Sequence, residues 1–164
     1  MKILAIVFTL VFLVWGIDRI VMSYLFSIDI SQHLKRAADA NTIPIAMSEL
    51  DIVIKNIESK GLTKGTVSLF LHQPKNDIGF WYNNINNSYK ELAVLPVEAT
   101  PLEKSNMLMK LRETLSDNGN NGSTSITQPE GIAIHPYNRL YFIWGAGSFV
   151  LACLWWFFYS RKFW

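Results

Sequence analysis

The stretch that decides the fold is LYFIWGAGSFVLACLWWFFY, residues 140–159, which contains no charged residue. Arg139 precedes it, and Arg161 and Lys162 follow it. A helix of 20 residues is about 30 Å long, which matches the hydrocarbon core of a bilayer. Aromatic side chains crowd its last turns, and such rings favour the headgroup level. We expect a transmembrane helix over 140–159, followed by a basic and aromatic cytoplasmic tail over 160–164; a buried helix in a soluble core is the alternative.

A second uncharged run, Ile3–Ile17, lies at the other end of the chain. As a helix it would be only about 22 Å long, so the helix must continue beyond it to cross a bilayer. The apolar series does resume after Asp18 and Arg19. We expect a transmembrane helix over 1–26, with these two polar residues near the outer headgroups, where the long side chain of Arg19 can reach water.

The same N-terminal run has features of a cleaved signal peptide, because Lys2 gives it a basic start. Small residues that could precede a cut, Gly16 and Ser23, are present, but an A-x-A pattern is not. We therefore expect the helix to be retained, with cleavage near Gly16 as the alternative. A retained helix either extends as a stalk to about residue 40 or breaks at Ser27–Ser31.

Charges near the ends of the apolar runs predict the orientation. Lys2, Arg161 and Lys162 lie on short tails, and short basic segments stay in the cytoplasm. Arg19 and Arg139 lie on the other side, but connections longer than about 60 residues are largely exempt from this rule. We predict a two-pass protein of the cell inner membrane, with both termini cytoplasmic and the central domain periplasmic or extracellular.

Small residues suggest how the two apolar helices meet. They fall on one stripe of each helix: Ala5, Thr9, Gly16 and Ser23 in the first, and Gly145, Ser148 and Ala152 in the second. Such stripes let helix backbones approach closely where lipid supplies no hydrophobic driving force. We expect these residues to pack the helices together; the alternative is that small residues are simply tolerated in spanning helices.

The central region, residues 27–139, carries 11 Lys and Arg against 12 Asp and Glu, which is typical of a small soluble domain. Apolar residues recur there every three or four positions, which predicts helices beginning after Thr42, Asp77 and Thr100. The sequence Thr100-Pro101-Leu102-Glu103 is the best local signal, because it combines a capping box with proline in the first turn. The predicted fold class is mainly α, with two transmembrane helices flanking a small helical extracytoplasmic domain.

Two parts of this domain lack a helical pattern. Residues 66–72 have a period of two, which predicts one short strand or an extended segment. One side would carry Val67, Leu69 and Leu71, and the other Thr66, Ser68, Phe70 and His72. Residues 116–130 are rich in Asn, Gly, Ser and Thr and offer little apolar area to offset the entropy of ordering. We expect a mobile loop over 116–130.

The sequence contains no motif that positions a nucleophile beside a base, and no phosphate-binding or dinucleotide-binding motif. His33, His72 and His135 are far apart and lack the spacing of metal ligands. Cys153, the one cysteine, lies in an apolar helix where a thiol is unreactive. Net charge is only +2, without a basic stripe. We predict no catalytic residue, metal site, cofactor or nucleic-acid partner.

Three consecutive aromatic residues, Phe80, Trp81 and Tyr82, cannot all face the core side of one helix. We interpret them as candidate anchors for a protein partner, since exposed aromatic rings dominate many interfaces. The alternative is that two of them are buried and the third covers a neighbouring side chain.

The segments Gly79-Phe80-Trp81-Tyr82 and Thr100–Leu115 (TPLEKSNMLMKLRETL) resemble small uncharacterised bacterial two-pass membrane proteins. This resemblance implies no activity. The order of helix, external domain and helix is also similar to the input half of two-pass bacterial sensors, in topology only. Such receptors carry a signalling module after the second span, where this chain ends, so a sensed signal would have to pass to a partner.

The function we predict is that of a membrane-anchored, non-catalytic binding, scaffold or regulatory protein. It would act through helix-to-helix contacts in the bilayer and through the external domain, with a protein partner or in a homo-oligomer. The alternatives are an extracytoplasmic ligand sensor, a subunit of an oligomeric pore or transporter that uses Asp18 and Arg19, and an enzyme secreted after signal cleavage.

Overall fold

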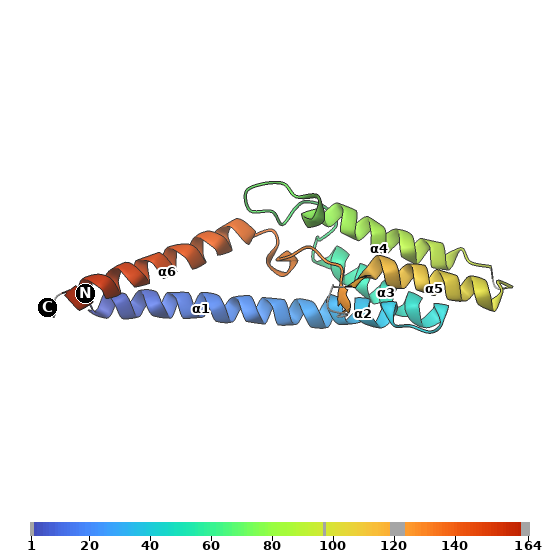
Figure 1. Cartoon of the computed structure of the whole chain (residues 1–164), viewed down its shortest axis with the longest axis horizontal. Helices are drawn as coiled ribbons and strands as arrows, with labels where there is room; N and C mark the ends of the chain where they lie inside the picture. The colour runs from blue at the N-terminus through green and yellow to red at the C-terminus, as the bar shows by residue number, and fades with distance from the viewer. Residues whose placement is uncertain (1, 97, 119–123, 162–164) are drawn as a thin grey trace.

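The computed structural model describes residues 2–96, 98–118 and 124–161. The structure is mainly helical (75%), which confirms the predicted mainly α fold class. The described residues form five continuous helices and a two-stranded sheet. The molecule is elongated (Figure 1): two long helices run antiparallel at one end, and shorter helices form a bundle at the other. We call the first part the hairpin and the second part the head. The start of α1 and the end of α6 lie at the end of the hairpin that is remote from the head.

One continuous helix connects the two parts. Helix α1 (Lys2–Phe26) passes through a π-helical turn, η1 (Ser27–Ser31), into helix α2 (Gln32–Ala38). The first helix therefore extends as a stalk and does not break at Ser27–Ser31. A wider, π-helical turn occupies these residues instead. A π turn contains an extra residue, which rotates the helix that follows it. Ile30 and Leu34 are fully buried, so this extension forms part of the core of the head.

The head is completed by helices α3 (Ile43–Ser59), α4 (Ile78–Ala93) and α5 (Pro101–Leu115), which lie near the three predicted ranges. Their apolar faces meet around α2. The largest fully buried side chains of this core are Ile30, Leu34, Leu50, Val53, Ile57, Ile78 and Ile85. The head thus has an apolar interior and a charged exterior, as a small soluble domain does.

Side-chain caps fix where two of the head helices, α4 and α5, begin. The Asp77 carboxylate accepts a hydrogen bond from the Phe80 N–H at 3.0 Å. The Thr100 hydroxyl accepts from the Glu103 N–H, and the Glu103 carboxylate accepts from the Thr100 N–H at 2.7 Å. The bonds that the Glu103 carboxylate accepts from the Thr100 N–H and from the Thr100 hydroxyl hold the pKa of Glu103 below its usual value. The predicted capping box is therefore confirmed.

Charged side chains tie α2 to α3. The Glu49 carboxylate on α3 is buried and lies 2.6 Å from His33 Nδ1 and 2.6 Å from Arg36 Nη2, both on α2. A buried carboxylate needs such partners, because desolvation without them is costly. The last part of the continuous helix is therefore fixed in the head by polar contacts as well as by apolar packing.

The strands lie where the sequence predicted a loop. β1 (Ser116–Asn118) and β2 (Thr124–Ile126) pair antiparallel, with Ser116 opposite Ile126. The expectation of a loop over the whole of 116–130 is wrong for these strands, because Ile126 packs against the core and the Thr127 N–H donates to the Leu115 carbonyl at 2.9 Å. Residues 119–123 lie outside the described residues.

The segment 66–72 is an extended segment and not a strand, which is one of the two predicted forms. Its bridge between Thr66 and Asp77 is isolated. A 3₁₀ turn, η2 (Pro74–Asn76), leads from it into α4. After β2, a second turn, η3 (Ile132–Ile134), buries Ile132 and Ile134 and leads the chain back to the hairpin.

Helix α6 (Asn138–Ser160) returns along α1 and completes the hairpin. By length and composition, Lys2–Ala38 and Asn138–Ser160 are both apolar and long enough to cross a membrane. In the most apolar window of each helix, only 6% and 17% of the residues, respectively, are buried. The hairpin therefore presents its apolar side chains outward.

Candidate functional site

Four of the seven small residues predicted to pack the hairpin are buried. Ala5 on α1 and Gly145, Ser148 and Ala152 on α6 are covered. The hydroxyl of Thr9 accepts a hydrogen bond from Trp156 Nε1 at 3.1 Å, which connects the two helices directly. The remaining two lie elsewhere: Gly16 has open space beside its Cα, and Ser23 is exposed.

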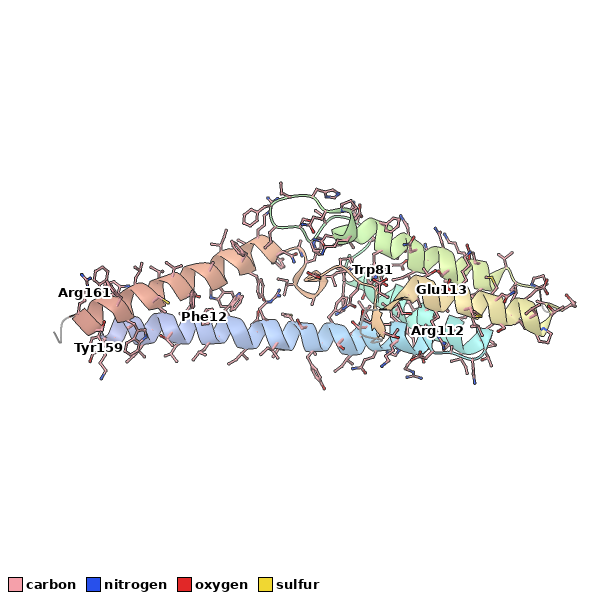
Figure 2. All side chains as sticks on the ribbon, viewed as in Figure 1. Phe12, Trp81, Arg112, Glu113, Tyr159 and Arg161 are labelled. Atoms are coloured by element: carbon pink, nitrogen blue, oxygen red, sulfur yellow. The ribbon has the colours of Figure 1, made fainter. Side chains whose placement is uncertain are left out.

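Gly145 lies directly under the indole ring of Trp15. A Cβ atom built at Gly145 would be 2.5 Å from this ring, closer than any real contact allows. Trp15 Nε1 also donates to the Tyr141 carbonyl at 2.9 Å, and Trp15 packs against Phe12. Figure 2 labels Phe12 on α1, where its ring lies 5.5 Å from the ring of Phe149 on α6. Aromatic and small residues therefore interlock at the hairpin contact.

The two predicted intramembrane polar residues have different surroundings. The carboxylate of Asp18 accepts a hydrogen bond from the Tyr141 hydroxyl, across the hairpin. Arg19 makes no hydrogen bond or ion pair with the described residues and lines two clefts at the head end of the hairpin. Trp15 and Tyr141 were missed by the sequence analysis. Their spacing was the available signal: Trp15 is one turn before Asp18, and Tyr141 is one turn before Gly145.

A large cleft lies where α1 leaves the hairpin and enters the head. Its volume is about 950 Å³. We call it the junction cleft. Its apolar lining includes Phe26, Phe80, Trp81, Ile85, Leu115, Ile126, Ile132 and Ala133. Its polar lining includes Arg19, Ser23, Lys75, Asp77, Asn84, Asp117, Gln128 and Glu130. A ligand with an apolar body and a polar or charged end would match these two kinds of wall.

The predicted aromatic anchors divide between this cleft and the head core. Trp81 is buried and its Nε1 donates to the Thr127 carbonyl at 2.8 Å, whereas Phe80 is exposed at the rim of the cleft. Figure 2 labels Trp81 near the middle of the molecule, where α4 meets the returning chain. Tyr82 donates to the Glu58 carboxylate on α3 at 2.7 Å, and this bond raises the pKa of Tyr82 above its usual value. Of the three, only Phe80 presents an exposed ring.

Hydrogen bonds hold the cleft wall formed by residues 127–133. Besides the bond from Trp81, the Ser31 hydroxyl donates to Gln128 Oε1 at 2.8 Å, which joins this segment to the π-helical turn. Asn138 Nδ2 donates to the Gly131 carbonyl at 2.8 Å, which joins it to the start of α6. The cleft is thus bounded by the continuous helix that includes α1 and by the head, and one of its walls is tied to the start of α6.

The histidines are not gathered into one site. His33 contacts Glu49, His72 is exposed in the 66–72 segment, and the ring of His135 lies against Gly65. Burial lowers the pKa of His135. The described residues contain no group of three His, Cys, Asp or Glu side chains that could hold a metal ion.

No protein-family model, curated protein or solved structure matches this chain. The resemblance to small bacterial two-pass membrane proteins therefore stays a prediction. The function is inferred from the geometry described above: the outward apolar faces of the hairpin, the continuous helix into the head and the junction cleft between them.

Proposed function

We propose that this chain is a two-pass protein of a bacterial inner membrane that serves as a non-catalytic binding or regulatory subunit. The observation that carries the proposal is the exposure of apolar side chains around a well-packed hairpin contact. In water, leaving apolar area exposed forgoes roughly 25 cal/mol per Å². Inside a bilayer the same side chains contact lipid tails at no such cost, and the buried small residues pack as spanning helices do.

The placement of the termini supports one topology. The start of α1 and the end of α6 lie at the same end of the hairpin (Figure 1), so two spanning helices would put both tails on one side and the head on the other. Lys2 and Arg161 belong to these tails, and basic residues on short segments favour the cytoplasmic side. The head would then lie in the periplasm or outside the cell.

A regulatory role is supported by the connection between hairpin and head. Helix α1 continues into α2, and Glu49 ties α2 to α3. A partner that shifts α1 relative to α6 would therefore move α2 within the head. The partner proposed here is a membrane helix of another protein or of a second copy, packed on the exposed face of α6.

Photo-crosslinking in intact membranes tests this proposal. A photoreactive amino acid is introduced singly at Ile143, Leu151 and Leu154, which are exposed on α6. Ala152, buried in the hairpin, is the matched control. We expect discrete protein adducts from at least one exposed position and only intramolecular products from Ala152. If the exposed positions yield lipid adducts alone, the binding role is contradicted.

The junction cleft favours a second candidate, an extracytoplasmic ligand sensor. The cleft is lined by α1 residues such as Arg19 and Ser23 and by head residues such as Asn84, so an occupant would contact both. Thermal unfolding of the full chain in nanodiscs, screened against amphiphilic small molecules, tests this function. Stabilisation should be lost in Asn84→Trp, which fills the cleft, and kept in Asn87→Trp, which lies on the exposed face of α4. A screen without a stabilising compound would count against a sensor.

A further inference from the structure

The segment between α3 and α4 ends in an apolar tip. Phe70 and Leu71 are 78% and 79% exposed, in contrast to Val67 in the same segment, which is part of the core. A soluble domain gains nothing from holding two adjacent large apolar side chains in water. We call residues 69–72 the tip, and its position relative to the hairpin indicates what covers it.

The base of the tip is fixed by backbone hydrogen bonds. The Val67 N–H donates to the Asn76 carbonyl at 3.1 Å, and the Ile78 N–H donates to the Gly65 carbonyl at 2.9 Å. The Ser68 hydroxyl accepts from the Gln73 N–H at 3.3 Å, which closes the loop. The head therefore holds the tip in a defined direction.

That direction is toward the hairpin. In Figure 1 the loop between α3 and α4 extends back beyond the start of α4, above the first turns of α6. The ring of Phe70 lies 5.4 Å from the ring of Phe142 on α6, edge to face at 90°. Phe142 belongs to the uncharged run that begins at Leu140. Phe70 thus lies at the depth of the first turn of the second apolar run.

The first apolar run reaches its end at the same depth. Asp18, which follows the uncharged run Ile3–Ile17, accepts a hydrogen bond from the hydroxyl of Tyr141, the neighbour of Phe142. Two independent contacts therefore place the polar boundary of both helices and the tip at one level. In a membrane-spanning hairpin this level is the interface on the head side.

Charge at the tip agrees with this position. A cleft of about 650 Å³ beside the tip is lined by Phe70, Leu71 and Phe142 and also by Arg19 and Lys75. Lys75 is 4.0 Å from the exposed carboxylate of Glu130, and its side chain remains largely exposed. Cations above an apolar tip match the order of lipid phosphates above acyl chains.

We propose that Phe70 and Leu71 insert into the leaflet on the head side of the bilayer and form a third membrane contact of this protein. The inference rests on the proposed membrane placement of the hairpin. Insertion of the tip fixes how far the head stands from the lipid surface, and it keeps the mouth of the junction cleft close to the headgroups.

Fluorescence quenching by spin-labelled lipid tests the insertion. Cys153→Ser removes the single native thiol, and Leu71→Cys, Ile143→Cys and Val94→Cys are then labelled singly with an environment-sensitive dye in full chains reconstituted into liposomes. Ile143 reports on the proposed span. Val94 is 81% exposed and lies at the end of α4 remote from the hairpin, so it is matched to Leu71 in exposure but not in position.

We expect lipids with a spin label near the headgroup to quench the dye at position 71 at least half as strongly as the dye at position 143. The dye at position 94 should be quenched less than a tenth as strongly as the dye at position 143. Lipids labelled deep in the acyl chain should quench Leu71 less than the shallow ones do. If Ile143 is quenched while Leu71 behaves as Val94 does, the tip inference is overturned and the membrane placement stands. If Ile143 is not quenched, both proposals fail.

Discussion

The head and the hairpin are built from the same kind of element but distribute their side chains in opposite ways. In the head, Leu50, Val53 and Ile57 point inward and are fully buried, while charged side chains cover the outside. In the hairpin, small residues such as Ala5 and Ser148 are buried and large apolar side chains such as Ile20 and Ile143 are exposed. Helix content alone therefore does not distinguish the two parts.

On the proposed membrane placement, this difference reflects two different solvents. Apolar burial stabilises the head because water surrounds it. The hairpin lacks that driving force if lipid surrounds it, and its contacts are then those of spanning helices: close backbone approach, interlocked rings and hydrogen bonds between helices. The bond between Tyr141 and Asp18 belongs to the last kind.

The largest effect is expected from truncating a leucine. Leu50 is fully buried in the head, so Leu50→Ala should lower the free energy of unfolding by about 2–5 kcal/mol through lost burial and a cavity. Leu13→Ala removes the same atoms from an exposed position of α1 and should cost less than about 1 kcal/mol. Chemical denaturation of the full chain in nanodiscs, followed by circular dichroism, measures both. Equal losses would contradict the proposed contrast.

The next effect is overpacking at the hairpin contact. Gly145→Val would drive a side chain into the ring of Trp15 and should weaken the α1–α6 contact by about 1–3 kcal/mol. Gly147→Val, two residues away and facing open space, is the control. Crosslinking between cysteines placed at Phe12 and Phe149 in the Cys153→Ser background reports the contact. The yield should fall for Gly145→Val only, and an unchanged yield would argue against this packing.

A smaller effect is expected at the polar contact between the helices. Asp18→Asn and Tyr141→Phe should each destabilise the hairpin, and together they should show a coupling energy of about 1 kcal/mol. A double-mutant cycle, with the crosslinking yield as the readout, isolates this interaction. Strictly additive effects would mean that the two groups do not interact in the membrane.

The smallest effect concerns pH and is confined to the head. Burial lowers the pKa of His135, so the unfolded chain, with an ordinary histidine pKa of about 6.5, binds the proton more readily than the folded chain. Stability should be complete above that pH and decrease as the pH falls through it. His135→Gln should flatten this dependence between pH 7 and 5, and His72→Gln, at an exposed position, is the control substitution. A persistent slope in His135→Gln would exclude this origin.

Features with local signals could be predicted from the sequence. The apolar run at 140–159 lies within α6, and the Asp77 and Thr100 caps begin α4 and α5, because a cap needs only residues within one turn of it. The β1–β2 pair could not be predicted in the same way. Its composition is that of a loop, and its order depends on Ile126 meeting a core formed by distant parts of the chain.

The candidate site shows the same division. Phe80 and Trp81 were singled out for their aromatic character and do line the junction cleft, but Tyr82 is held by Glu58, 24 residues earlier. The contact between Trp15 and Tyr141 joins residues 126 positions apart. Only the folded arrangement of α1 against α6 brings such pairs together, so a single sequence with local periodicity does not reveal them.

Site-specific labelling from outside the cell tests most directly whether the hairpin crosses a membrane and carries the head beyond it. In the Cys153→Ser background, Lys90→Cys lies on the exposed surface of the head and Ser160→Cys at the end of α6 near the termini. A membrane-impermeant maleimide added to spheroplasts should label Lys90→Cys and should reach Ser160→Cys only after the membrane is permeabilised. Labelling of both positions in sealed spheroplasts, or of neither, would contradict a two-pass hairpin with an external head.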